Sequence, residues 1–288
     1  MIMFSNLSAG ALGLSLDHNR AIDLAVKHGF GGVDPDLGYF RDLGSAAAIA
    51  EHAASVKERG LSWGISGLPV ALTGSAEEFR TSLAGLPEAL GLLAAAGVTS
   101  VGTWIRPMHD ELSYRRNWVL HVSRLHLVAD LLADAGLRLG LEYIGPKTFW
   151  STERFAFIHS IGEALELIAE IGKPNIGLIL DSYHWYTAGE SAIDLVGLTD
   201  ADIVSVDIND ARDDRQRDEQ QDLDRRLPGS TGVIDLQGFM AAVRAAGYSG
   251  PVKVEPFMKS LAEQPVDDVL ADVVGRLDQA ISGSSQVQ

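Results

Sequence analysis

The sequence predicts an α/β protein of one domain, a (β/α)8 barrel. Short apolar runs typical of buried strands alternate with segments in which apolar residues recur every three or four positions, and eight such pairs fill the chain. This strict alternation indicates a parallel sheet covered by helices, and eight units favour a sheet that closes on itself. An open doubly wound sheet ranks lower because no G-x-G-x-x-G follows the first strand and no P-loop pattern occurs.

The expected elements follow one another along the chain. The strand-like runs are rich in Val, Ile and Leu, and a glycine suited to a left-handed C-cap follows six of the helices. The expected strands are residues 2–6, 32–36, 61–66, 98–105, 138–143, 176–181, 203–207 and 251–255. The expected helices are residues 19–28, 46–59, 76–95, 114–135, 162–171, 191–196, 236–246 and 266–281. The capping glycines are Gly29, Gly60, Gly97, Gly136, Gly172 and Gly247.

Length and composition favour a single large domain. With 288 residues and 46% hydrophobic content, the chain can bury a core of barrel size. The barrel domain is expected to comprise residues 1–281. The polar, Ser-rich end, residues 282–288, is expected to be a disordered tail.

Composition also excludes several classes of function. The absence of cysteine removes disulfides, thiolate metal sites and thiol nucleophiles. No apolar run approaches the ~18 residues that a membrane span needs, and the start lacks the order of a secretory signal, so a cytoplasmic protein is expected. The net charge of −16, from 39 acidic and 23 basic residues, argues against binding to nucleic acid.

Four acids stand at or near the ends of expected strands in the second half of the chain: Glu142, Asp181, Asp207 and Glu255. In a closed parallel barrel these strand ends converge on one face. Four ionised carboxylates brought together would raise one another's pKa values, so a bound divalent cation is the economical explanation. Oxygen ligands without cysteine favour Mn²⁺ or Mg²⁺.

Such a site suits enolisation of a sugar or hydroxy-ketone. The ion would polarise a substrate hydroxyl or carbonyl, and a neighbouring carboxylate could remove or return a proton at the adjacent carbon. A single acid at a strand end often caps the next helix or pairs with a lysine instead. Four acids in register weaken that alternative.

The motifs around these acids resemble those of the xylose-isomerase-like sugar phosphate isomerase/epimerase superfamily, whose members are TIM barrels. The resemblance is carried by GLEYIGPKT (140–148), LDSYHWY (180–186), DINDA (207–211), LPGSTGVID (227–235) and VEPF (254–257). The first half matches only in its alternation and in generic phrases such as AVKHGFGGVD (25–34).

The resemblance implies a divalent metal held by Glu, Asp, His and Glu, which fall on Glu142, Asp181, Asp207 and Glu255. It also implies that Glu142 and Glu255 transfer protons, and that His184 lies beside the substrate. One position departs from the pattern, because Asp207 stands where relatives carry histidine. A carboxylate adds a negative charge, shifts the preference further toward hard cations and removes a possible base.

Further substrate contacts are weighed against plain structural roles. His184 could be a packing histidine, but its position three residues after Asp181 favours a substrate contact. Arg106 at the end of the fourth strand could bind substrate or form a salt bridge. Lys147, Trp150 and Arg226 could line the barrel mouth or serve only as surface and loop-packing residues.

Three functions remain open from the sequence. The first is a metal-dependent isomerase or epimerase of a keto-sugar or related polyol. The second is a lyase resembling the catalytic subunits of C-glycoside deglycosidases, which act on 3-keto glycosides, and a copurifying second subunit would favour it. The third is a non-catalytic sugar-binding barrel in which Asp207 has ended catalysis. The superfamily also contains abasic-site endonucleases, which the negative charge disfavours.

The partners expected are a small sugar or glycoside and, by default, further copies of the same chain. The highly charged segment 212–226 follows the seventh strand. It is expected to be a solvated loop or short helix, with a lid over the site as the alternative, because loops after barrel strands form the active-site face.

Overall fold

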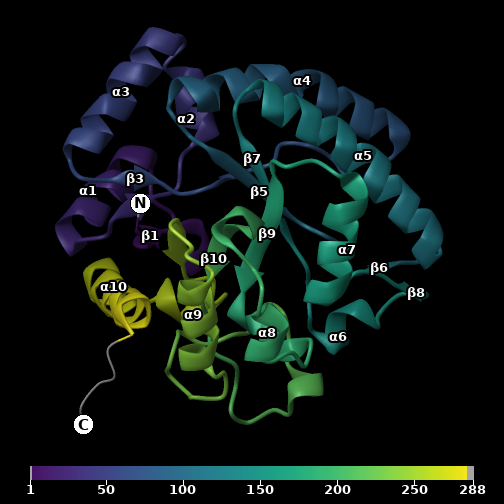
Figure 1. The fold of residues 1–288 in the computed structure, drawn as a ribbon. Helices are drawn as coiled ribbons and strands as arrows, with labels where there is room; N and C mark the ends of the chain where they lie inside the picture. The colour runs from purple at the N-terminus through teal and green to yellow at the C-terminus, as the bar shows by residue number, and fades with distance from the viewer. Residues whose placement is uncertain (1, 284–288) are drawn as a thin grey trace.

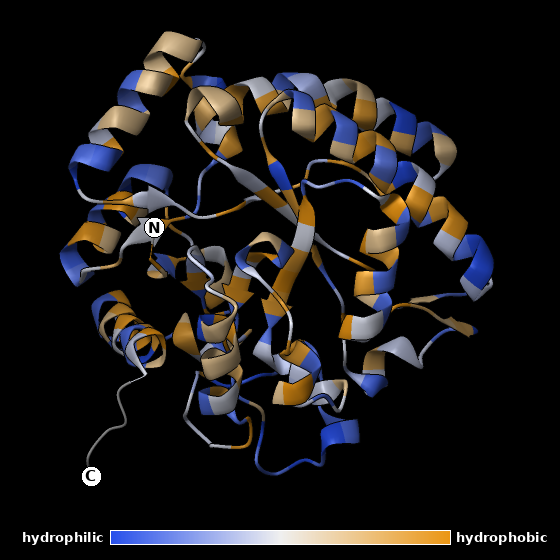
Figure 2. Cartoon of the chain, viewed as in Figure 1, coloured by the Kyte–Doolittle hydropathy of each residue, from blue (hydrophilic) through white to orange (hydrophobic). Residues whose placement is uncertain are grey.

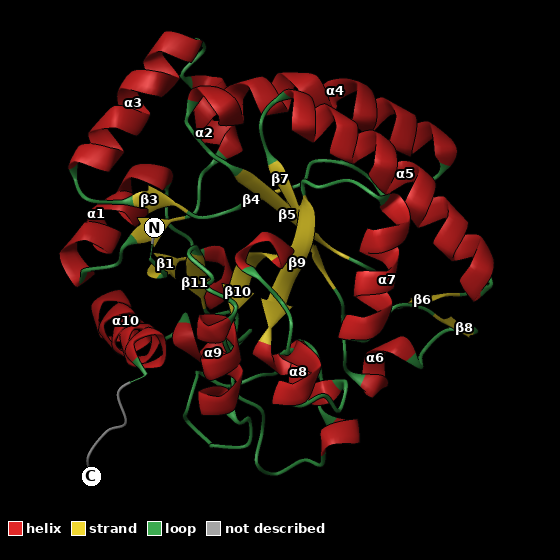
Figure 3. Cartoon of the chain, viewed as in Figure 1, coloured by secondary structure: helices red, strands yellow, loops and turns green. Residues whose placement is uncertain are grey.

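A computed structural model of the chain describes residues 2–283. Within this range, nine short strands form one parallel sheet that curls into a barrel, and helices surround it (Figure 1, Figure 3). The strands are β1 (Phe4–Leu7), β2 (Gly32–Val33), β3 (Ser62–Trp63), β4 (Ser66–Gly67), β5 (Ser100–Trp104), β7 (Arg138–Glu142), β9 (Ile176–Asp181), β10 (Ile203–Asp207) and β11 (Pro251–Lys253).

The order of the strands shows how the barrel closes. It runs β3-β2-β1-β11-β10-β9-β7-β5-β4, and every pairing is parallel. The outermost strands, β3 and β4, are consecutive pieces of one stretch of chain, so that stretch joins both ends of the sheet. The predicted single-domain (β/α)8 barrel is therefore confirmed, with its third strand split in two.

Seven of the helices are long enough to cover the barrel, and five of them, α1, α3, α4, α7 and α9, begin with a capping side chain. Ser75 and Glu78, for example, form a capping box at the start of α4. All six glycines predicted as C-caps have φ between 69° and 85°. These helices are α1 (His18–His28), α3 (Ala46–Glu58), α4 (Ala76–Ala95), α5 (Tyr114–Asp134), α7 (Ile161–Ile171), α9 (Leu236–Ala245) and α10 (Val266–Ser282).

Shorter elements lie between them. The helix expected at 191–196 is a 3-10 turn (Ala192–Leu195), and the α-helix of that unit comes earlier, as α8. The 3-10 turns also include Gly10–Leu12, Asp200–Asp202, Arg217–Glu219 and Lys259–Leu261. The sequence analysis missed α2 (Leu37–Asp42), α6 (Lys147–Trp150), α8 (Ser182–Thr187) and the antiparallel pair β6 (Met108–His109) and β8 (Phe155–Ala156).

The C-terminal helix extends slightly beyond its expected end. It includes Ser282, which the sequence analysis had placed in the tail, and Gly283 caps it with φ 69°. Residues 284–288 of the expected tail lie outside the described residues. No helix within residues 2–283 combines the length and apolar character needed to cross a membrane.

Apolar side chains fill both the barrel and the layer between strands and helices. Figure 2 shows mostly hydrophobic strands at the centre and helices that carry polar residues on their outer faces. Inside the barrel, a side chain on Gly140 would approach Ile179 Cγ1 to 2.8 Å and Val204 Cβ to 3.2 Å. Glycine at this position leaves room for Ile179, so neighbouring strands pack closely beneath the acids.

Glu190 ties the loop after β7 to the start of α7. The Tyr143 hydroxyl donates to Glu190 Oε2 at 2.5 Å, and the Ile161 N–H donates to Oε1 at 2.6 Å. Burial raises the pKa of Glu190 from 4.5 to about 7, although both hydrogen bonds oppose the shift. The Glu190 carboxyl group therefore binds its proton more tightly in the folded state than in the unfolded state. As a result, the free energy of unfolding falls as the pH rises from 4.5 to 7.

Glu190→Gln is expected to remove this pH dependence, because glutamine does not ionise. Between pH 5 and pH 8 the wild-type protein should lose stability that the variant keeps. The difference in free energy of unfolding, variant minus wild type, should therefore rise over this range by at most about 3 kcal/mol. Thermal unfolding of both proteins at the two pH values measures this difference. A stability difference that is the same at pH 5 and pH 8 would contradict the prediction.

Candidate metal centre and active site

The four acids predicted as metal ligands lie together at the carboxyl ends of neighbouring strands. Glu142 ends β7, Asp181 ends β9 and Asp207 ends β10, whereas Glu255 follows β11 by two residues. One carboxylate oxygen from each acid lies within 4.8 Å of one from every other acid. The adjacency of β11, β10, β9 and β7 in the sheet produces this convergence.

The electrostatics of the cluster fit a divalent cation. Burial, and then the charges of Glu255, Asp181 and Asp207, raise the pKa of Glu142 well above its usual range. Glu142 Oε1 is buried and has no hydrogen-bond partner. Burial also raises the pKa of Asp207 to about 7, although Lys253 opposes the shift. A buried carboxylate oxygen without a donor is unfavourable beside like charges, and a cation bound among the four oxygens would relieve both effects.

A buried arginine that the sequence analysis did not select lies among these acids. The Arg225 side chain is 2% exposed; its Nη1 donates to Asp181 Oδ2 at 2.8 Å and lies 3.6 Å from Glu255 Oε2. Its Nη2 donates to Asp222 Oδ1 at 2.8 Å. Burial alone would lower the pKa of Arg225, but Asp181, Asp222 and Glu255 together raise it above its usual range. The guanidinium therefore stays charged.

Two aromatic rings hold Arg225 in place. The rings of Tyr183 and Phe257 each lie 4.8 Å from the guanidinium carbon. Phe257 has φ 49°, a left-handed conformation that a bulky side chain seldom adopts, and it is the one non-glycine residue with positive φ in residues 2–283. This unfavourable backbone conformation lies two residues after Glu255 and presents the ring to Arg225.

Asp181 and Glu255 are further fixed by one amide side chain. Asn209 Nδ2 donates to Asp181 Oδ1 at 3.2 Å, and Asn209 Oδ1 accepts from the Glu255 N–H at 2.9 Å. Asp181 also caps α8 by accepting from the Tyr183 N–H at 2.7 Å. A side chain at Gly145 would come within 2.3 Å of the His184 carbonyl oxygen, so glycine lets the loop after β7 pack directly on α8.

His184 lies on α8 beside the acids, as the sequence analysis expected. Its Nε2 is 3.8 Å from Glu142 Oε1 and 3.9 Å from Asp181 Oδ2. Arg225 Nη2 lies 3.2 Å from the same nitrogen, and because arginine can only donate, Nε2 is the acceptor. Burial lowers the pKa of His184 to about 4, so the imidazole is neutral near pH 7.

The other residues predicted to contact substrate do not join this cluster. Arg106 is ion-paired with Glu153, and Lys147 Nζ lies 2.9 Å from Asp218 Oδ2. Trp150 stacks on His159 at 4.6 Å between ring centroids. Arg226 Nη1 lies 3.0 Å from Asp224 Oδ1. The salt bridge of Arg106 was weighed in the sequence analysis as the alternative to a substrate contact, and contact of these four residues with substrate stays a prediction.

Arg225 and Lys253 are the residues that the sequence analysis missed. Lys253 Nζ lies 3.2 Å from Asp207 Oδ2. Its signal was present in the alternation of PVKVE, where Lys253 and Glu255 are separated by apolar Val254 and so can face the same side. Arg225 had no such signal, because it lies within a run of charged residues, 212–226, whose composition is typical of a solvated loop.

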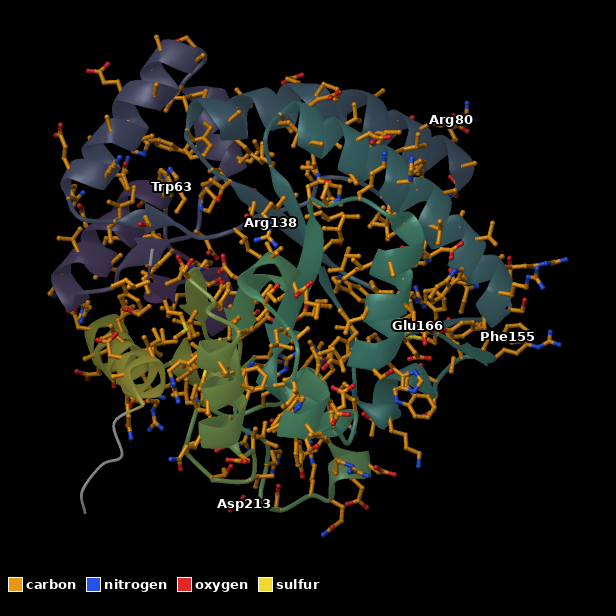
Figure 4. All side chains as sticks on the ribbon, in the orientation of Figure 1. Trp63, Arg80, Arg138, Phe155, Glu166 and Asp213 are labelled. Carbon is orange, nitrogen blue, oxygen red and sulfur yellow. The ribbon has the colours of Figure 1, made fainter. Side chains whose placement is uncertain are left out.

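The charged segment 212–226 packs against the site side of the barrel. The Thr148 hydroxyl donates to the Gln220 carbonyl at 2.6 Å, and the Tyr183 hydroxyl donates to the Gln221 carbonyl at 2.6 Å. Figure 4 shows Asp213, near the start of the segment, at the outer edge of the molecule. The segment thus runs from an exposed edge to the buried Arg225. Its movement as a lid stays a prediction.

Asp210 organises the loop that follows this segment. The carboxylate is buried and accepts backbone N–H groups from Thr231 (3.0 Å), Gly232 (2.8 Å), Ile234 (3.1 Å) and its neighbour Ala211 (2.9 Å). One side chain therefore satisfies four donors, three of them in the loop before α9.

Asp210→Ala is expected to lower the free energy of unfolding by about 4 kcal/mol, because these donors lose their acceptor. Asp235→Ala is the matched control. Asp235 is an exposed N-cap that accepts one bond, from the Gly238 N–H at 2.9 Å, and its loss should cost about 1 kcal/mol. Urea unfolding of the three proteins measures both values, and equal losses in the two variants would contradict the prediction.

A hollow lies at the carboxyl ends of β1, β2 and β4. It encloses about 460 Å³, and its walls include Leu7, Ser8, Val33, Asp34 and Ser66. A second hollow of about 570 Å³ lies between α9 and α10, and none of the four acids lines either hollow. The first hollow, at the carboxyl ends of barrel strands, is the one placed to hold a substrate.

The closed parallel barrel with acids gathered at its strand ends defines the class of TIM-barrel proteins with a polar site at the barrel mouth. Within that class, the chain belongs to the xylose isomerase-like TIM barrel family, whose family profile matches residues 22–278. The resemblance seen in the sequence motifs is therefore confirmed.

Curated relatives in this family are isomerases, epimerases and dehydratases. The inosose isomerase of Halalkalibacterium halodurans is 29% identical over 136 residues, which are 47% of this chain and 45% of that protein. The 3-dehydroshikimate dehydratase of Pseudomonas aeruginosa is 30% identical over 152 residues, 49% of this chain and 21% of that protein. The ketose 3-epimerase of Arthrobacter globiformis is 26% identical over 143 residues, 50% of this chain and 43% of that protein. The matches thus span less than half the length of these relatives.

Solved structures match over nearly the whole chain. A xylose isomerase domain protein from Alicyclobacillus acidocaldarius is 32% identical, with a TM-score of 0.86 and coverage of 98% of this chain and 99% of that one. The IolI protein, solved with a bound zinc atom, has a TM-score of 0.81 at 18% identity, with full coverage of both chains. At that identity the second likeness shows the shared fold alone.

Proposed function

We propose that the protein is a divalent-metal-dependent isomerase or epimerase that acts on a hydroxylated ketone, either a keto-sugar or a related polyol. The observation that carries the proposal is Glu142 Oε1, buried without a hydrogen-bond donor among three further acids. The names of the relatives add support, because inosose, ketose and 3-dehydroshikimate are all ketones that bear hydroxyl groups. Proton removal beside the carbonyl of such a ketone could begin its isomerisation, epimerisation or dehydration.

Glu142, Asp181, Asp207 and Glu255 would hold the ion, and Mn²⁺ or Mg²⁺ suits their oxygen atoms. When bound, the ion supplies a positive charge that polarises the substrate carbonyl. Glu142 and Glu255 are the proposed proton-transfer groups. One accepts the proton from the carbon next to the carbonyl while the C–H electron pair forms the enediolate, and the other returns a proton to that carbon or its neighbour.

His184 and Arg225 are proposed to orient the substrate. His184 is neutral, and its Nε2, which accepts from Arg225, lies within 4 Å of Glu142 and Asp181, so the imidazole would border a substrate bound at the acids. Arg225 fixes the imidazole by donating to Nε2 and holds Asp181 at the same time. Both groups are positioned before substrate arrives, which reduces the entropy lost in reaching the transition state.

A lyase is the second candidate, favoured by the matches to 3-dehydroshikimate dehydratases. It would use the same deprotonation and then expel a group from the carbon beyond, as water or as the aglycone of a 3-keto glycoside. Product analysis separates the reactions, because an isomerase or epimerase conserves the substrate's mass. A non-catalytic sugar-binding barrel is the third candidate.

The test combines metal analysis with hydrogen exchange. Protein loaded with Mn²⁺ is analysed by mass spectrometry for metal, then incubated in D₂O with inosose or D-fructose while NMR follows the hydrogens beside the carbonyl. We expect about one ion per chain and exchange of these hydrogens, with both lost in Asp181→Ala. Asp218→Ala, which removes exposed ion pairs with Lys147 and Arg217, should retain both. No bound metal after loading would overturn the metal-dependent mechanism.

A third outcome is that the metal binds but the hydrogens beside the carbonyl of inosose and D-fructose do not exchange, and 3-dehydroshikimate does not lose water. The non-catalytic barrel would then be the better description. A cytoplasmic location, self-association or a second subunit, and the absence of a nucleic-acid partner stay predictions.

A further inference from the structure

Lys253 stands inside the acid cluster, and the function proposed above gives it no role. It is the last residue of β11, in register with Asp207 on β10. Its Nζ lies 3.2 Å from Asp207 Oδ2, and its side chain is 13% exposed. The ammonium is therefore largely enclosed by the barrel but remains reachable from its mouth.

The charge on Lys253 is maintained by its neighbours. Burial alone would lower the pKa of Lys253, but Asp207, Glu255, Asp34 and Glu142 together raise it well above its usual range. Asp207 places an extra negative charge where the resemblance leads one to expect a neutral histidine. Lys253 adds one positive charge. Together, Asp207 and Lys253 therefore contribute no net charge to the cluster.

The ammonium has hydrogen-bonding capacity that the protein does not use. It carries three N–H donors, and Asp207 is its one ion-pair partner within 4.0 Å among residues 2–283. Charge balance needs only that contact. The remaining donors are free for a substrate oxygen.

Asp34 connects Lys253 with the hollow at the ends of β1, β2 and β4. Asp34 lines this hollow of about 460 Å³, and its charge acts on Lys253. The charges of Glu255 and Glu142, the two proposed proton-transfer groups, also act on Lys253. Lys253 is therefore close to an acid that lines the hollow and to the acids of the cluster, in register with Asp207 on the neighbouring strand.

We propose that Lys253 is a catalytic residue whose ammonium donates a hydrogen bond to the substrate's carbonyl oxygen and stabilises the negative charge that develops there. The inference rests on the proposed function. In the step concerned, the C–H bond beside the carbonyl breaks and its proton passes to a glutamate carboxylate. The C–H pair becomes the C=C bond and the carbonyl π pair moves onto oxygen, beside the ammonium. Lys253 keeps its own proton, and no oxidant or reductant is needed.

The decisive comparison is between the wild-type protein, Lys253→Met and Lys253→Gln, each measured per chain that carries metal. If Lys253 only balances the charge of Asp207, bound Mn²⁺ supplies that positive charge, and both variants should exchange hydrogens within about threefold of the wild-type rate. If Lys253 stabilises the enediolate oxygen, Lys253→Met should lose hydrogen exchange by at least ~100-fold, as when one oxyanion donor is removed, and Lys253→Gln, whose amide donor is neutral, by at least about tenfold. Lys27→Met is the matched control, because it removes a surface Lys–Asp pair of 2.7 Å with Asp267.

Two measurements are made on each Mn²⁺-loaded protein. The first is hydrogen exchange of inosose or D-fructose in D₂O, per chain that carries metal. The second is calorimetric titration with acetohydroxamate, a probe that presents an anionic oxygen like that of an enediolate. We expect its affinity to fall at least tenfold in both Lys253 variants and to be unchanged in Lys27→Met.

The outcomes separate the two hypotheses. If the wild-type protein exchanges these hydrogens and both Lys253 variants do so within about threefold of its rate, the role of Lys253 is overturned and the proposed function stays intact. Absence of exchange in the wild-type protein would count against the proposed function itself. Lys253→Gln keeps a polar side chain beside Asp207, so it keeps the test valid even if Lys253→Met fails to fold.

Discussion

Arg225→Met is expected to lower the free energy of unfolding of the metal-free protein by about 3–5 kcal/mol, the usual cost of leaving buried charges without a partner. The arginine contacts Asp181 and Asp222 at 2.8 Å and lies 3.6 Å from Glu255, so its loss leaves several buried or half-buried acids uncompensated. Added Mn²⁺ should recover part of this loss, because the ion supplies positive charge to the same acids. Thermal unfolding with EDTA and with Mn²⁺ measures both effects.

Arg226→Met provides the control for this prediction. Arg226 is the next residue along the chain, but it pairs with the partly exposed Asp224, and exposed pairs contribute about 0–1 kcal/mol. Equal destabilisation in the two variants would show that Arg225 is not the organising cation of the cluster. A loss in Arg225→Met that is the same with EDTA and with Mn²⁺ would separate Arg225 from the metal site.

The second large effect is expected in Glu142→Gln and Glu255→Gln. Each should lower the rate of hydrogen exchange beside the carbonyl by about 10²–10⁴-fold, because an amide cannot accept the proton. Glutamine still offers a carbonyl oxygen, so both variants should keep measurable affinity for Mn²⁺. NMR in D₂O gives the rate, and calorimetric titration of the metal-free protein gives the affinity.

Glu153→Gln is the control, since Glu153 pairs with Arg106 outside the cluster. It should leave exchange and metal affinity unchanged. If Glu142→Gln and Glu255→Gln bind Mn²⁺ with unchanged affinity and exchange hydrogens at the wild-type rate, neither glutamate is a proton-transfer group, and another base must be sought.

The strands that carry the acids were the most predictable part of the fold. The runs 176–181 and 203–207 match β9 and β10 at both ends, because each is a continuous apolar stretch that stops on an acid. The strands of the first half were predicted less well: 32–36 and 61–66 contain only β2 and the split pair β3 and β4. Their pairing is limited to two residues each, which periodicity does not reveal.

The acidic part of the candidate site could be predicted for a simple reason, whereas its cations could not. Acids at the carboxyl ends of neighbouring parallel strands converge independently of the conformation of the loops. Recognising four such strand ends in the sequence was therefore sufficient to predict the acid cluster. Arg225 reaches Asp181 from 44 positions along the chain, out of a segment whose composition is that of a solvated loop. Its burial among the acids and the packing of Tyr183 and Phe257 on its guanidinium distinguish it from Arg226, and both are tertiary properties.

The division of the barrel into long and short strands separates two tasks within one ring. The acids rest on β7, β9 and β10 and just beyond β11, and β9 pairs with β7 over three residues and with β10 over four. The hollow is bordered by β1, β2 and β4, where β1–β2 and β4–β5 pair over two residues each and residues outside the strands make up most of the wall. Substitutions along that wall can therefore reshape which molecule fits without moving the acids. A chain built this way can acquire new specificities while its reactive half is inherited unchanged.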